Sequence, residues 1–133
     1  MRDEAFRFET RHESRREIYK VFGFLNKRDG IGTDEFIDYY ENHHVPLILS
    51  LAPTPLLYKR RYVVHGEKLT EGSNDVDFDV MTELGFADRE AFLAWMGKLS
   101  SPGAGEQVAA DEARFLDRSR TRAYVVDERI TSG

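Results

Sequence analysis

The stretch from Phe36 to Leu47, FIDYYENHHVPL in one-letter code, has the pattern of one amphipathic helix. On a helical wheel Phe36, Tyr40, His43 and Leu47 fall on one line, and His44 lies on its flank. A helix normally buries such a line, and polar groups that are buried there need hydrogen-bond partners. We therefore interpret this line as the wall of a cavity.

The end of this helix is predicted from its proline. The residue before a proline disfavours the α-helical conformation, so the pair Val45-Pro46 predicts that the regular helix ends or kinks near His44. The helix is expected to begin at Thr33, a good N-cap residue that follows the turn residues Gly30 and Gly32.

The segments around this helix predict an α+β fold. Alternating or continuous apolar patterns rich in β-branched and aromatic residues predict strands at 18–25, 56–64, 78–86 and 121–127. A second helix is expected after a capping Asp88, with the apolar stripe Phe92, Trp95, Met96 and Leu99, and a third helical piece is expected at about 106–116. The order is the β-α-β-β-α-β pattern of a ferredoxin-like unit with a four-stranded antiparallel sheet. Helices cover only one face of such a sheet, whereas strand 18–25 is apolar on both faces, so we expect a homodimer.

Length and composition limit the possible classes of protein. The 133 residues suit one domain, which we place at 17–128, between a charged N-terminal extension at 1–16 and a loose tail at 129–133. A net charge of −5 disfavours nucleic-acid binding. The chain has no cysteine, no apolar run that would cross a membrane and no signal-peptide pattern, and we expect a cytoplasmic protein.

Three motifs resemble the EthD family of dimeric α+β barrel proteins. They are Phe36-x-x-Tyr39-Tyr40-x-x-x-His44-x-Pro46-Leu47, the run from Phe78 to Phe86, and the run from Asp111 to Leu116, with Tyr40 where tryptophan is common. The resemblance implies a homodimer with a pocket between the helices and the sheet of each subunit. Relatives in this superfamily include cofactor-free cyclases, dehydratases and monooxygenases acting on polyketide-like aromatics, isomerases, and haem proteins.

His44 is the leading candidate for a catalytic residue, because imidazole can take up and return a proton near neutral pH and the family motif contains this histidine. The alternative is a histidine that only bonds a carbonyl group at the helix end. His43, more central on the wheel, is expected to be a core histidine that holds the pocket wall. The residues predicted to contact a ligand are Tyr40, His43, Tyr58, Tyr62, Asp79, Glu83 and Trp95. By pattern alone, Tyr40 and Trp95 also suit core packing, and Tyr58 and Tyr62 would lie at the partner interface if their strand face meets a second sheet.

The two acidic candidates have a competing structural interpretation. Asp79 and Glu83 share one face of strand 78–86, where they would supply a buried acid or orient His44. They are equally suited to pair with Lys59 or Arg60 across the sheet.

Two functions from different classes follow. The first is a cofactor-independent enzyme that uses His44 to move a proton on a small aromatic or polyketide-like substrate, as a dehydratase, cyclase, isomerase or monooxygenase. The second is a non-catalytic dimeric binding protein of a catabolic or biosynthetic pathway, with haem binding as a sub-case. Neither interpretation includes a metal site, because neighbouring histidines on a helix point about 100° apart.

Overall fold

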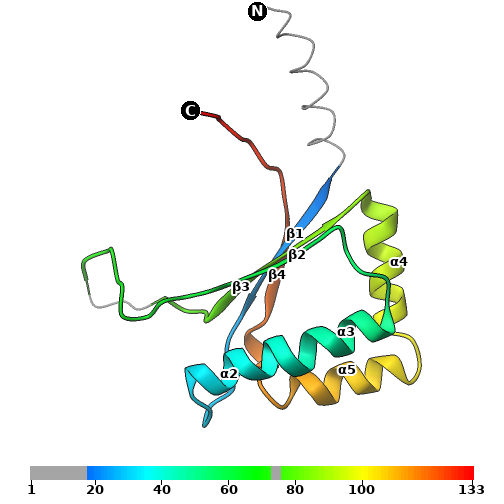
Figure 1. The fold of residues 1–133 in the computed structure, drawn as a ribbon, viewed down its shortest axis with the longest axis horizontal. Helices are drawn as coiled ribbons and strands as arrows, with labels where there is room; N and C mark the ends of the chain where they lie inside the picture. Colours follow the sequence, from blue (N-terminus) through cyan, green and yellow to red (C-terminus); the bar gives the residue numbers. More distant parts are fainter. Residues whose placement is uncertain (1–17, 73–75) are drawn as a thin grey trace, which may run out of the picture.

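The computed structural model describes residues 18–72 and 76–133, and its centre is a four-stranded antiparallel sheet (Figure 1). The strands are β1 (Tyr19–Leu25), β2 (Leu57–Tyr62), β3 (Val80–Phe86) and β4 (Arg122–Val126). Their order across the sheet is β2-β3-β1-β4, so the first and third strands are central. Val21 on β1 lies opposite Leu84 on β3 and Val125 on β4. The predicted sheet is confirmed, with each strand slightly shorter than expected.

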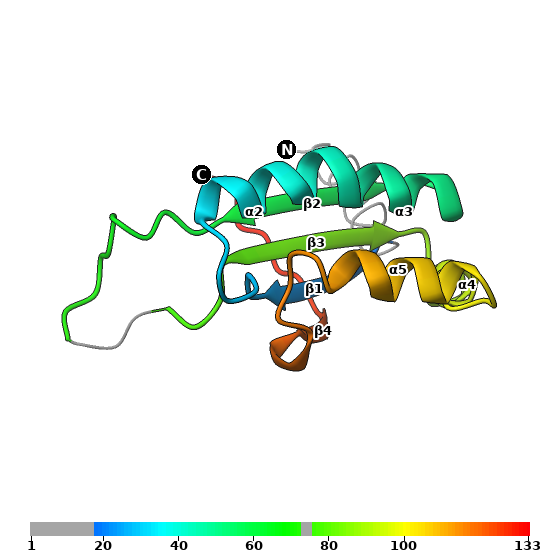
Figure 2. The same ribbon diagram turned by 90° about the horizontal axis from the view of Figure 1, so that it is seen from below.

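The helices cover one face of this sheet (Figure 1). They are α2 (Thr33–Tyr39), η1 (Tyr40–His44), α3 (Val45–Leu51), α4 (Arg89–Leu99) and α5 (Ala104–Glu112), with a short 3₁₀ helix η2 (Arg118–Arg120) before β4. In Figure 2, α2 and α3 follow one line on the β2 side of the sheet, and α5 lies on the β1 side. As predicted, the Asp88 side chain caps α4 by accepting a hydrogen bond from the Ala91 amide.

The prediction that the regular helix ends or kinks near His44 is only partly correct, because regular α-helix gives way to a π turn at Tyr40 but the chain stays helical through the proline. The segments α2, η1 and α3 are consecutive, and Val45 keeps helical angles of φ −58° and ψ −48° directly before Pro46. A proline removes one amide donor and crowds the carbonyl group one turn earlier. Here η1, a π-helical turn with its different pairing of carbonyl groups, ends at His44, two residues before the proline. We attribute the continuity of the helix to that turn.

The π turn also changes which residues face the sheet. The buried residues of the long helix follow one another at steps of four, namely Phe36, Tyr40, His44 and Ile48. In a regular α-helix, a step of four residues turns the side-chain direction by about 40° beyond a full turn, so successive steps drift away from the face that meets the sheet. A π-helical turn contains more residues, and so holds these four on one face. The prediction for His43 is therefore wrong, because its side chain is exposed whereas His44 is 6% exposed.

The core consists of two clusters under the helices. One contains Ile31, Phe36, Tyr40, Val80, Phe115 and Leu116, and the other contains Ile48, Ala52, Phe86 and Trp95. Tyr58 on β2 packs against both of them. Phe36, Tyr40, Val80 and Phe115 are almost fully buried, so they fix the helix layer on the sheet.

The predicted N-terminal extension at 1–16 lies outside the described residues. After β4, residues 127–133 contain no helix or strand. Among the helices of the described ranges, none combines the length and the apolar character that a membrane span requires.

Candidate functional site

A cavity of about 420 Å³ lies between the helices and the covered face of the sheet. All four strands contribute to its floor, and its walls come from η1, α3, α4, α5 and η2. Most of the lining is apolar, and the ionisable or hydrogen-bonding side chains that interrupt it are Tyr40, His44, Tyr58, Thr82, Trp95, Ser100, Glu112, Arg118 and Thr121. A cavity of this size suits a small organic ligand.

His44 reaches this cavity from the π turn and is held there by an aspartate of α5. Its Nδ1 atom lies 2.8 Å from Oδ2 of Asp111. Within the described part of the chain, Nδ1 is the only ring nitrogen of His44 with a hydrogen-bond partner. A carboxylate accepts hydrogen bonds, so the neutral imidazole carries its proton on Nδ1 and keeps a lone pair on Nε2. That is the arrangement of an oriented general base.

A pair of buried hydroxyl groups lies one helical turn before His44. The hydroxyls of Tyr40 and Thr82 share a hydrogen bond of 2.7 Å, and both residues line the cavity. Burial raises the pKa of Tyr40, although the hydrogen bond with Thr82 opposes the rise. Burial also raises the pKa of Tyr58, and the neighbouring Tyr40 adds to that rise. These phenols are therefore neutral groups that can donate hydrogen bonds at physiological pH.

A second polar cluster ties the edge strand β2 to the long helix. The Glu41 carboxylate accepts hydrogen bonds from Nε and Nη2 of Arg60, at 2.9 and 2.6 Å, and from the Tyr62 hydroxyl at 2.6 Å. The hydrogen bonds from Arg60 hold the pKa of Glu41 below its usual value. The guanidinium of Arg60 also lies 4.8 Å from the centre of the Tyr58 ring. This cluster fixes the orientation of Tyr58 at the cavity.

The structure brings four of the predicted site residues together. Tyr40, His44, Tyr58 and Trp95 all line the cavity, from three different elements. Tyr62 lies behind this wall, where its ring packs edge-on against Phe36 and its hydroxyl contacts Glu41.

His43 and the two predicted acids lie elsewhere. The His43 ring is exposed and stacks on Tyr39 with the ring centres 4.7 Å apart, because the π turn directs His44 inward instead. Asp79 precedes β3, accepts a hydrogen bond from the Lys27 amide at 2.8 Å, and pairs with His65 at 2.9 Å. It stabilises the loop after β1 and is absent from the cavity lining.

Glu83 is on the opposite face of the sheet from the cavity, because side chains alternate along β3 and Thr82 faces the cavity. Its carboxylate is 3.0 Å from Nζ of Lys20 and 2.9 Å from Nη2 of Arg61. Burial raises the pKa of Glu83, but the hydrogen bonds from Lys20 and Arg61 outweigh this and keep the pKa below its usual value. The predicted pairing with basic residues across the sheet is thus correct in kind, with Arg61 and Lys20 as the partners.

The acid that orients His44 is Asp111, which the sequence did not identify as a site residue. From the sequence, Asp111 was noted only as the first residue of the third family motif, 67 positions after His44. Glu112 and Arg118 also line the cavity and form an ion pair of 3.1 Å with each other. An acidic residue, Glu112, on an otherwise apolar helix face is the sequence feature that could have indicated polar groups of this helix at the cavity.

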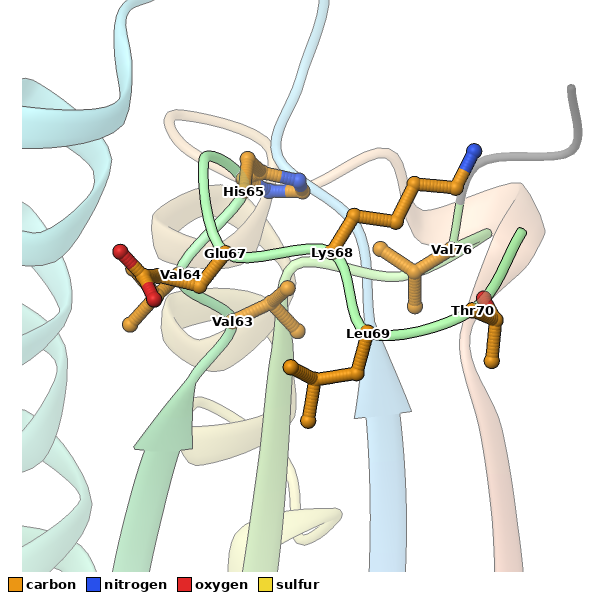
Figure 3. A pocket seen from close by; sticks show the side chains of 8 residues that line it. All are labelled: Val63, Val64, His65, Glu67, Lys68, Leu69, Thr70 and Val76. Carbon is orange, nitrogen blue, oxygen red and sulfur yellow. The ribbon is translucent and has the colours of Figure 1, made fainter. Parts of the chain in front are cut away.

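Another hollow, of about 350 Å³, lies under the loop that joins β2 to β3 (Figure 3). It is lined by Val63, Val64, His65, Glu67, Lys68, Leu69, Thr70 and Val76. The histidine of this hollow is bonded to Asp79, and its described lining contains no phenylalanine, tyrosine or tryptophan. Within residues 18–72 and 76–133, no group of three or more histidine, cysteine or acidic side chains is arranged to hold a metal ion.

Solved structures with a similar fold include two EthD proteins. An EthD-family protein from Bacillus halodurans has a TM-score of 0.57 and 18% identity, over 84% of this chain and 99% of its own. An EthD-like protein from Ralstonia eutropha has a TM-score of 0.56 and 19% identity, over 83% and 88%. A DABB-family protein with a ferredoxin-like fold from Mesorhizobium loti has a TM-score of 0.51 and 11% identity, over 84% and 96%. These likenesses establish the ferredoxin-like fold.

No curated protein matches the chain. The family model of the EthD domain matches residues 28–119. The matched range runs from the loop after β1 to η2, and it includes the helix with His44 and the aspartate that orients it. The chain belongs to the EthD family.

Proposed function

We propose that this protein is a cofactor-independent enzyme in which His44 moves a proton on a small aromatic or polyketide-like substrate. The observation that supports it is a His–Asp pair, 2.8 Å apart, at a largely apolar cavity of about 420 Å³. Structural histidines in a core need a partner for each buried nitrogen, whereas here Nε2 remains for a ligand. The proposed reaction class is proton abstraction next to a carbonyl group or from a phenol, as in dehydration, cyclisation or isomerisation.

The position of His44 within the helix sets which charged groups act on it. A histidine at the C-terminal end of a helix would gain from the helix dipole when protonated. His44 instead lies in the middle of a continuous helix, which runs on through α3 to Leu51. Asp111 is then the principal charged group that contacts it.

The neighbouring hydroxyls suit the oxygen of such a substrate. Tyr40, Thr82 and Tyr58 lie in the same lining as His44 and can hydrogen-bond a carbonyl or phenol oxygen. The rest of the lining, including Phe92 and Trp95, offers apolar and aromatic surface to a ring. A proton taken by His44 would then leave negative charge on an oxygen that these hydroxyls stabilise.

The direct experiment identifies a ligand and asks whether it changes. Trp95 is the only tryptophan of the chain and lines the cavity, so its fluorescence reports ligand binding. The compounds to test are a panel of hydroxylated aromatics and linear β-diketones. We expect a bound compound to be converted on incubation, and we expect the His44→Ala variant to bind it without conversion. Recovery of every bound compound unchanged after long incubation with excess protein would instead identify a binding protein.

We also propose that the protein is a homodimer that covers the outer face of its sheet. Helices cover the other face of the sheet (Figure 1). Val21 and Gly23 line the cavity on that covered face, so Phe22 and Phe24 lie on the outer face, opposite Met81 and the exposed Tyr124 of the neighbouring strands. A second copy of the same face would bury these side chains. Light scattering should give the mass of a dimer for the wild type and of a monomer for Tyr124→Asp. Leu93→Glu, at an exposed apolar position of α4, should remain dimeric, and a monomeric wild type would contradict the proposal.

A further inference from the structure

Tyr39 lies behind the His–Asp pair and contacts it without lining the cavity. Its hydroxyl donates a hydrogen bond of 2.6 Å to Oδ1 of Asp111, while Oδ2 of the same carboxylate contacts His44. Each oxygen of Asp111 therefore has its own partner. Because the two partners are on opposite sides of the carboxylate, rotation of Asp111 would break both hydrogen bonds at once.

The tyrosine ring is itself fixed by its neighbours. His43 stacks on it at 4.7 Å with an angle of 26° between the planes, and Phe115 packs against it at 5.2 Å. Burial raises the pKa of Tyr39, and its hydrogen bond to Asp111 adds to the rise. The phenol therefore keeps its proton across the physiological range and acts towards Asp111 only as a donor.

We propose that Tyr39 is a positioning residue for His44, which it controls through Asp111. The hydrogen bond from Tyr39 holds the Asp111 carboxylate in the orientation that contacts Nδ1 of His44. It also reduces the negative charge that the carboxylate presents to the imidazole. A carboxylate with fewer donors binds a neighbouring cation more strongly. Tyr39 thus weakens the hold of the Asp111 carboxylate on the imidazolium form, and leaves Nε2 of His44 oriented as the proton acceptor. This role of Tyr39 rests on the proposed function of His44.

We expect the other groups around the Tyr39–Asp111–His44 chain to stay in place when the Tyr39 hydroxyl is removed, including the Arg114 guanidinium, 6.0 Å from the Tyr39 ring centre. Tyr40 and Phe115 pack against the imidazole with ring centres 5.4 and 4.9 Å away. The remaining ionisable groups of the cavity lining are Tyr58, Glu112 and Arg118, and the last two are paired with each other. Substitution of Tyr39 by phenylalanine retains the stacked ring and removes one donor, so it isolates the hydrogen bond to Asp111.

The test is a titration of the histidine side chains by nitrogen NMR, in the full chain without any ligand. In the wild type we expect a single neutral tautomer of His44, protonated on Nδ1. In Tyr39→Phe we expect the His44 pKa to rise by roughly half a unit to one unit, the size expected for one lost hydrogen bond to a charged group shared by two partners. Tyr19→Phe, which removes a hydroxyl on β1 that has no hydrogen bond to His44 or Asp111 among the described residues, should leave the titration unchanged.

His43 provides an internal control, since it stacks on the same ring and has no contact with Asp111 among the described residues. Its titration should move much less than that of His44. An unchanged or lowered pKa of His44 in Tyr39→Phe would overturn the proposal, because Tyr39 would then only pack against its neighbours. This outcome is independent of catalysis, so failure of the proposed function would appear separately, as turnover that His44→Ala leaves unchanged.

Discussion

His44 and Asp111 are 67 residues apart in the sequence, yet Nδ1 of the histidine lies 2.8 Å from Oδ2 of the aspartate. The histidine comes from the π turn η1, and the aspartate comes from the last turn of α5. Two helices that are far apart in the sequence therefore meet in one His–Asp pair on the covered face of the sheet. The fold brings this pair to a largely apolar cavity, where an oriented imidazole can act on a bound ring.

Replacement of Asp111 by asparagine should impair catalysis more than binding. An amide can donate its N–H to Nδ1 and thereby force the proton of the neutral imidazole onto Nε2, which removes the base from the cavity. We expect kcat to fall about a hundredfold, within the range of a lost general base, with KM nearly unchanged. Steady-state kinetics on a compound that the wild type converts would measure this, with Asp34→Asn at an exposed position of α2 as the matched control.

A preserved kcat in Asp111→Asn would show that the tautomer of His44 is irrelevant to the reaction. Circular dichroism of the variant would separate that result from unfolding.

The buried hydroxyl pair makes a prediction about stability. Tyr40 and Thr82 share a hydrogen bond of 2.7 Å in the core, so Tyr40→Phe leaves the Thr82 hydroxyl without its partner. We expect Tyr40→Phe and Thr82→Val each to lower the free energy of unfolding by about 1–2 kcal/mol. The double variant should cost less than the sum of the two, because it leaves neither hydroxyl unpaired. Urea unfolding of the four proteins gives the coupling, and strict additivity would contradict the hydrogen bond.

The ion pair of Glu41 with Arg60 predicts a dependence of stability on pH. The pKa of Glu41 is lowered in the folded protein by the hydrogen bonds from Arg60, so folding favours its charged form. This contribution is present above the pKa of the unfolded chain, about 4.3, and is lost as the pH falls through the lower pKa of the fold. The free energy of unfolding of wild type should therefore exceed that of Glu41→Gln near pH 7, and the difference should shrink below about pH 4.5.

Urea unfolding at a series of pH values would measure this difference. Glu35→Gln, at an exposed position of α2, should show no comparable trend. A difference between wild type and Glu41→Gln that stays constant from neutral to acidic pH would argue against the ion pair.

Much of the fold follows from the sequence because it depends on local patterns. The alternation along β3 places Thr82 on one face and Glu83 on the other, and the structure keeps that division. The apolar line of the long helix and the capping Asp88 are likewise properties of neighbouring residues.

The site depended on features that local patterns do not contain. The wheel assumed a regular α-helix and so placed His43 inside, whereas the π turn rotates His44 inward and leaves His43 on Tyr39. The role of Asp111 as the partner of His44 could not be predicted from the sequence for a different reason. Its partnership with His44 depends on how α5 packs beside the long helix, and spacing along the chain does not determine that packing.

The most direct test of the account compares two adjacent histidines. His44→Gln and His43→Gln make the same chemical change on one helix, the first at the cavity and the second on the surface. On a compound that the wild type converts, we predict that His44→Gln loses at least about a hundredfold in kcat and still quenches or shifts the Trp95 fluorescence on binding. His43→Gln should keep the wild-type kcat. Equal turnover by both variants and the wild type would contradict the proposal that His44 is the base of this enzyme.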